Sequence, residues 1–256
     1  MDIIERPTLE IDLEAELQAL AKKYRGANGL GMQVLNVIGG QAETLLAQLP
    51  EGVRDRIGDG TETALRLALK AAQNSRGVVG DQPGWLNTAM NTALGAAGGF
   101  GGLPSAMVEL PVTTTVLLRS IQGVAAEHGF DPATEGTQFD CIQVFAAAGP
   151  LGKNDGADLA FYSTRVAVSG AAVQALIRRV APKLAVVLGQ KLAPQTVPVL
   201  GAIAGAATNY AYTSYYQDIA HVHFRLRKLA IETDRPHADL VEDLRERVAP
   251  VPVKTV

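Results

Sequence analysis

The chain has 256 residues, of which 47% are hydrophobic and 19% are charged, and its formal net charge is −3. This length and apolar content are enough for one domain, or two small ones, with a sizeable core. The acidic balance excludes a generally basic nucleic-acid-binding protein, so we expect no nucleic-acid partner. Because Cys141 is the only cysteine, no disulfide framework can form, which favours a reducing compartment.

Helical periodicity dominates the sequence, and runs of alternating β-branched residues are nearly absent. The N-terminal segment is acidic and lacks an apolar run, so we expect no signal peptide. A first amphipathic helix is predicted over about 10–25, a second over about 31–48, a third over 51–74, and a loop over 75–84.

After this loop the sequence becomes rich in glycine and alanine. Helices are predicted over 85–100 and over 104–128, the second kinked at Pro111 and capped at its end by Gly129. The remaining predicted helices cover 134–148, 157–180, 182–192, 197–232 and 238–248. The fold class is therefore all-α, a single compact multi-helix domain of about eight or nine helices.

Two of the predicted helices carry ridges of small residues at intervals of four. Glycine inside a helix costs about 1 kcal/mol relative to alanine, and its usual purpose is close approach of two backbones. We therefore expect helices 85–100 and 197–216 to pack against each other or against helix 104–128. The residues assigned to this packing are Gly95, Gly99, Gly102, Gly201, Gly205 and Asn209.

Residues 192–217 carry no charge and are numerous enough to cross a bilayer. Few of them are strongly aliphatic, however, and prolines, threonines and an asparagine interrupt the segment. The sequence therefore favours a buried, close-packed helix over a membrane span.

Residues 159–217 contain five basic and no acidic side chains, and a tyrosine cluster then precedes the cationic run HVHFRLRK. This order is typical of a helix that meets an anionic lipid surface. The alternative is that the tyrosines fill gaps in the core and the cations cap a helix. The residues predicted to contact lipid are Arg178, Arg179, Lys183, Lys191, Tyr212, Tyr215, Tyr216, Arg225 and Arg227.

No nucleotide-binding, hydrolase or metal-binding motif of the common types is present, and we expect no cofactor and no metal. Glu109 is a candidate buried acid because it stands in a long uncharged stretch. A partner such as Arg119 is the favoured explanation, and a functional acid is the alternative. Asp218 and His221 share a helix face, but two ligands do not make a metal site.

Two segments carry a family resemblance. GAAGGFGGLPSAMVELPVTTTVLLRSIQGVAAEHGFDP resembles the signature block of the EcsC family of bacterial proteins, and LAPQTVPVLGAIAGAATNYAYTSYYQDIAHVHFRLRKL resembles its C-terminal block. The resemblance covers roughly residues 40–230. Glu109 stands where the family commonly shows Asp, and His128 where it commonly shows Tyr. The implied division is an N-terminal helical arm (1–30), an EcsC-like helical domain (31–235) and a short C-terminal helix with a tail (236–256).

The resemblance implies no biochemical activity, although the family takes its name from an operon that also encodes an ABC transporter. We expect a cytoplasmic, non-enzymatic protein that is peripheral to the inner membrane and binds anionic lipid or a membrane complex such as a transporter. One alternative is a soluble carrier of a hydrophobic ligand, a lipid or isoprenoid, held between helices. Another is a hydrolase or metalloenzyme that uses Glu109, Asp131, Asp218 and His221, which requires these residues to meet in space.

Overall fold

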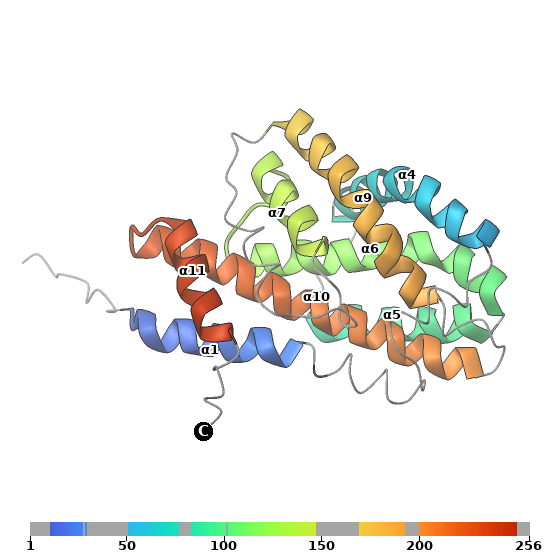
Figure 1. Ribbon diagram of the computed structural model, residues 1–256, viewed down its shortest axis with the longest axis horizontal. Helices are drawn as coiled ribbons and strands as arrows, with labels where there is room; N and C mark the ends of the chain where they lie inside the picture. Colours follow the sequence, from blue (N-terminus) through green and yellow to red (C-terminus); the bar gives the residue numbers. More distant parts are fainter. Residues whose placement is uncertain are drawn as a thin grey trace, which may run out of the picture.

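Eight α-helices make up nearly all of the part of the chain that the computed structural model describes, and no strand occurs there. The described residues are 11–27, 29, 51–76, 83–100, 102–146, 169–192 and 200–249. The helices are α1 (Leu13–Ala27), α4 (Glu51–Arg76), α5 (Gly84–Phe100), α6 (Gly102–Glu127), α7 (Glu135–Phe145), α9 (Gly170–Leu192), α10 (Leu200–Glu232) and α11 (His237–Val248) (Figure 1). The all-α prediction is confirmed.

Helix α10 is the central element of the molecule. It has 33 residues and is therefore about 50 Å long. Figure 1 shows α5 beside the first half of α10, and α1 and α11 beside its second half. Helix α6 packs against both α5 and α10, so each of these three helices contacts the other two.

Helices α4, α7 and α9 form a second group that packs on α6. Helix α4 packs on both α6 and α9, and α7 bridges α6 and α9. The main apolar cluster of the described residues draws side chains from every described helix except α5. Helix α5 is thus held in place by something other than the apolar core.

The C-terminus of α6 ends as its sequence predicts. Gly129 has a φ of +87°, a left-handed conformation that glycine adopts without strain. Its N–H donates to the Ala126 carbonyl at 2.9 Å, and the N–H of Phe130 donates to the Ala125 carbonyl at 2.9 Å. These two bonds satisfy carbonyls that the helix end would otherwise leave without donors.

The prediction of two separate helices, 157–180 and 182–192, is wrong. Helix α9 runs without a break from Gly170 to Leu192 with Pro182 inside it. A proline removes one backbone hydrogen bond, but Ile177 and Leu184, on either side, are both fully buried. Packing of both flanks on the core offsets the lost bond. Residues 157–168, and the whole of the helix predicted over 31–48, lie outside the described part.

Candidate functional site

Helix α5 has its polar residues inside and its apolar residues outside. Its buried residues are Asn87, Thr88, Asn91, Gly95, Gly98 and Gly99. Its exposed residues are Trp85, Ala89, Met90, Ala93, Ala97 and Phe100. A helix on the surface of a water-soluble domain shows the reverse pattern, with an apolar stripe facing the core.

The polar face of α5 is hydrogen-bonded to α10. The Asn91 side-chain amide donates to Thr213 Oγ1 at 2.9 Å, and the Asn209 amide donates to the Asn91 carbonyl at 2.7 Å. At the start of α5, Gln217 Nε2 donates to the Gly84 carbonyl at 2.9 Å. These hydrogen bonds give the inward polar face specific partners on α10.

The same face of α5 touches the backbone of α10 directly. A Cβ added at Gly95 would lie 2.2 Å from the Gly205 carbonyl oxygen, and one at Gly99 would lie 1.9 Å from the Gly201 oxygen. No side chain fits at either distance, so these glycines hold the two helices in backbone contact. Gly102, also predicted to pack, begins α6, and its surroundings lie outside the described residues.

The neighbouring parts of α6 and α10 repeat this reversal. Four of their larger apolar side chains are exposed, while polar side chains on the same segments are buried. The exposed residues are Val108, Val112, Ile203 and Tyr210, and the buried ones are Thr113, Thr114, Thr208 and Asn209.

The outward side chains of these three packed segments are here termed the apolar surface. It consists of Trp85, Met90, Phe100, Val108, Val112, Ile203 and Tyr210. The only charged residue between Asp81 and Arg119 is Glu109, and residues 192–217 contain none. Within the described ranges, no helix combines the length and the hydropathy needed to cross a bilayer.

Glu109 was predicted to be a buried acid, but its side chain is not among those the structure describes. Its expected partner, Arg119, donates to Ser75 Oγ on α4 at 2.8 Å.

Three of the tyrosines predicted to contact lipid are instead inside the protein, and that prediction is wrong. Tyr212, Tyr215 and Tyr216 are each at most 1% exposed. The Tyr216 ring lies 5.0 Å from the Phe145 ring and 5.2 Å from the Tyr215 ring, measured between centroids. Burial raises the pKa of Tyr212 above its usual range. The tyrosines fill the core, as the alternative interpretation held, and in their place Tyr210 is exposed.

The predicted lipid-binding cations fall into three groups. Arg178 and Arg179 are exposed on α9. The side chains of Lys183 and Lys191 lie outside the described residues.

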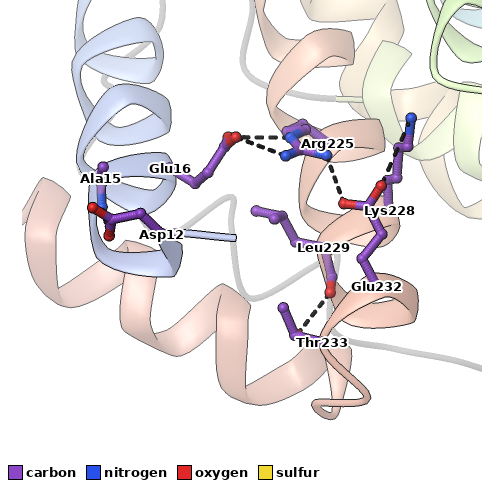
Figure 2. A network of polar contacts seen from close by, with 8 residues as sticks. All are labelled: Asp12, Ala15, Glu16, Arg225, Lys228, Leu229, Glu232 and Thr233. Carbon is purple, nitrogen blue, oxygen red and sulfur yellow. Dashed lines mark hydrogen bonds and ion pairs between the residues drawn. The ribbon is translucent and has the colours of Figure 1, made fainter. Parts of the chain in front are cut away.

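The third group, Arg225 and Arg227, pairs with carboxylates of the protein, so little of their charge remains for lipid. Arg225 donates to both carboxylate oxygens of Glu16, at 2.7 and 3.1 Å, and to Glu232 at 2.9 Å (Figure 2). Arg227 pairs with Asp140.

The Arg225 network lies in a groove of about 770 Å³ between α1 and α10. The groove is lined by Ile11, Asp12, Ala15, Glu16, Ala19, Arg225 and Glu232. The hydrogen bond from Arg225 lowers the pKa of Glu16, and the same bond raises the pKa of Arg225. Such a charged lining is unsuited to a lipid or isoprenoid, so this groove does not support the carrier alternative.

A histidine pair joins the end of α6 to α10. The Nε2 of His128 and the Nδ1 of His221 lie 3.1 Å apart, one donating and the other accepting. Burial, followed by the charge of His221, lowers the pKa of His128 to about 4, and burial also lowers the pKa of His221. Sequence reasoning missed this pair because 93 residues separate its members.

The described residues proposed for a hydrolase or metalloenzyme site have separate partners. Asp218 bonds to Lys23 Nζ at 2.6 Å, and Asp131 accepts the N–H of Ala133 at 2.9 Å in the turn after α6. Across the residues that the structure describes, no group of three or more acidic, histidine or cysteine side chains is placed to hold a metal ion.

The family model described as the EcsC protein family matches residues 85–229. The chain belongs to the EcsC protein family. The match begins at residue 85 rather than near residue 40, and it runs from the start of α5 almost to the end of α10. It therefore includes all of the apolar surface of this EcsC protein. Curated proteins and solved structures gave no match.

Proposed function

We propose that this EcsC protein is a non-enzymatic peripheral membrane protein, located on the cytoplasmic face of the inner membrane, that binds an anionic lipid surface. The observation that carries the proposal is the reversed polarity of α5 and of the adjoining parts of α6 and α10. Their apolar side chains face outward and their polar side chains face inward.

Soluble monomers rarely expose so many large apolar side chains on one group of packed helices, because contact of such side chains with water is unfavourable. Trp85 is 70% exposed and Phe100 is 68% exposed, at the two ends of α5. Tryptophan and tyrosine are favoured where a protein meets the headgroup region of a membrane, and Trp85 and Tyr210 are both exposed. Lipid would remove this surface from water.

The exposed cations of α9 support an anionic lipid surface. Arg178 and Arg179 are exposed, and residues 169–192 contain no Asp or Glu. A basic side chain close to an anionic membrane contributes about 1 kcal/mol of attraction, which salt weakens.

Vesicle flotation at low and high salt tests the proposal. We expect binding to anionic vesicles, weaker binding at high salt, and little binding to neutral ones. The double variant Arg178→Glu/Arg179→Glu should lose at least tenfold in affinity. The control is Arg245→Glu on α11, which is also exposed, reverses a charge and should bind as the wild type does.

A second pair of variants tests the apolar surface. Trp85→Ser/Phe100→Ser should bind at least tenfold more weakly, because each side chain would lose apolar burial in lipid. Ile231→Ser is the matched control, since Ile231 is 64% exposed but lies on the charged half of α10. Equal recovery of wild type in the unbound fraction with and without anionic vesicles would sink the proposal. Binding to native membranes but not to protein-free vesicles would instead indicate a membrane complex as partner.

A further inference from the structure

The exposed residues of α5 form one continuous stripe along the whole helix. Residues 85, 89, 93, 97 and 100 follow one another at intervals of four, four, four and three, which places them on one face. These positions hold two large aromatic side chains and three alanines, and Met90 lies beside them. Helix α5 has 17 residues, so the stripe is about 25 Å long.

Helix α5 cannot rotate about its axis to turn this stripe inward and its opposite face outward. Gly95 and Gly99 lie against the α10 backbone, and an alanine turned into either place would bring a Cβ into an α10 carbonyl. Rotation would also break the hydrogen bonds that join Asn91 to Asn209 and Thr213. The stripe is therefore held outward by the packing of the other face.

The charge distribution selects the environment that this stripe fits. Helix α5 carries no charged residue, and the first charge along α10 is Asp218. A charge-free apolar face complements the acyl layer of a lipid leaflet, whereas the charged half of α10 suits water. The length of α5, about 25 Å, is less than the roughly 30 Å hydrocarbon core, and only one side of the helix is apolar.

Given the membrane binding proposed above, we infer that α5 lies in the plane of one leaflet, with the stripe from Trp85 to Phe100 among the upper acyl chains. Its polar face stays bonded to α10. A helix apolar on one side enters a membrane in this orientation, with that side buried about 5–10 Å.

Trp85 is the only tryptophan of the chain, so its fluorescence reports the environment of one end of the stripe. Wild-type protein is mixed with anionic vesicles that contain lipids brominated high on the acyl chain. We expect a blue-shifted emission, loss of quenching by acrylamide, and quenching by the brominated lipid.

Two variants place the reporter elsewhere. Trp85→Phe/Phe100→Trp moves it to the other end of the stripe, where the same quenching is expected because α5 lies in the plane. Trp85→Phe/Ile231→Trp moves it to the charged half of α10, where acrylamide should still quench and brominated lipid should not. Circular dichroism verifies that each variant is folded.

Each other outcome has a separate meaning. Quenching at position 100 with Trp85 left accessible would overturn the inference in favour of end-on entry. Flotation with no lipid quenching at either position would overturn it and leave the proposed membrane binding standing. A blue shift that depends on protein concentration without lipid would overturn it in favour of a second copy on the stripe. Failure of flotation would remove the proposed function itself.

Discussion

The two halves of α10 differ in charge and in the kind of contact they make with neighbouring helices. Residues 200–217 carry no charge and contact α5 through glycine backbones and side-chain amides. Residues 218–232 carry five charged side chains and contact α1 and α7 through ion pairs. One continuous helix thus has two different ends. The first end packs through glycines and side-chain amides, and the second packs on an apolar core and carries ion pairs on its surface.

The difference shows that the kind of side chain that is buried depends on what surrounds each end of the helix, water or an apolar neighbour. Around α1, α11 and the second half of α10, leucines and aromatic residues are inside and ion pairs outside, which suits water. Around α5, polar groups and glycines are inside and aromatic residues outside. That arrangement suits an apolar neighbour.

Among changes at the contact between α5 and α10, the largest effect should come from the glycines. Gly99→Ala would place a Cβ 1.9 Å from the Gly201 oxygen, so the helices must separate. We expect a loss of about 3 kcal/mol in the free energy of unfolding, measured by urea denaturation. Gly123→Ala on α6 is the control: its Cβ meets nothing within 4 Å, so stability should hold or rise by up to about 1 kcal/mol. Equal stabilities for both variants would refute the backbone contact.

At the charged end, the largest effect should come from Asp140. Its side chain is 15% exposed, pairs with Arg227, and lies 3.5 Å from Nε2 of the buried His223. Burial acts to raise the pKa of Asp140, but the hydrogen bond from His223 and nearby positive charge outweigh it and lower that pKa. Asp140→Ala should cost about 2–3 kcal/mol of unfolding free energy, because Arg227 and His223 would lose their acceptor.

The control for Asp140 is Glu62→Ala, which removes a more exposed partner of Arg66 one helical turn away. It should cost less than about 0.5 kcal/mol. A similar loss in both variants would show that the Asp140 cluster is no more important than a surface ion pair.

The histidine pair should make the charged end sensitive to pH. The pKa of His128 is lowered from 6.5 to about 4. Between these values the unfolded chain binds more protons than the folded one, so stability falls as pH decreases from about 6.5 to 4. The loss from this group should be about 1 kcal/mol, since it is partly exposed.

Melting curves across this pH range measure the effect. His128→Asn should reduce the loss of melting temperature by about 2–4 °C relative to wild type. The groups facing the pair are Glu127, Asp218, Lys23, Lys228 and Arg225. Identical pH profiles for the two proteins would exclude the pair as the source.

The smallest effect on stability in water should come from the stripe itself. Trp85→Ser/Phe100→Ser should change the free energy of unfolding by less than about 0.5 kcal/mol, because both side chains already face solvent. Phe145→Ala, in the core at 1% exposure, should cost about 3–5 kcal/mol. A large loss in the stripe variant would mean that the stripe is packed against protein.

Much of the fold could be predicted from the sequence, because helix periodicity, caps and glycine spacing are local properties. The all-α class, the Gly129 cap and the glycine ridges of helices 85–100 and 197–216 follow from residues within a few turns of one another. Whether these two helices pack on each other or on helix 104–128 was left open by the sequence, and the structure shows α5 against both α10 and α6. Pro182 shows the limit: the local signal predicted a break, and burial on both flanks kept the helix intact.

The candidate site was predicted less well, because it depends on which face of each helix meets a neighbour. The tyrosines of α10 lie near a cationic run in sequence, yet their helix turns them into the core. The bond between Arg225 and Glu16 spans 209 residues, and no local pattern indicates it. By itself, the sequence determined that α5 has one polar, glycine-rich face and one apolar face. The glycine spacing also predicted that the polar face packs on another helix. Only the tertiary structure decided that this helix is α10 and that Trp85 and Phe100 stay exposed, because contact between helices far apart in the sequence depends on the fold of the whole chain.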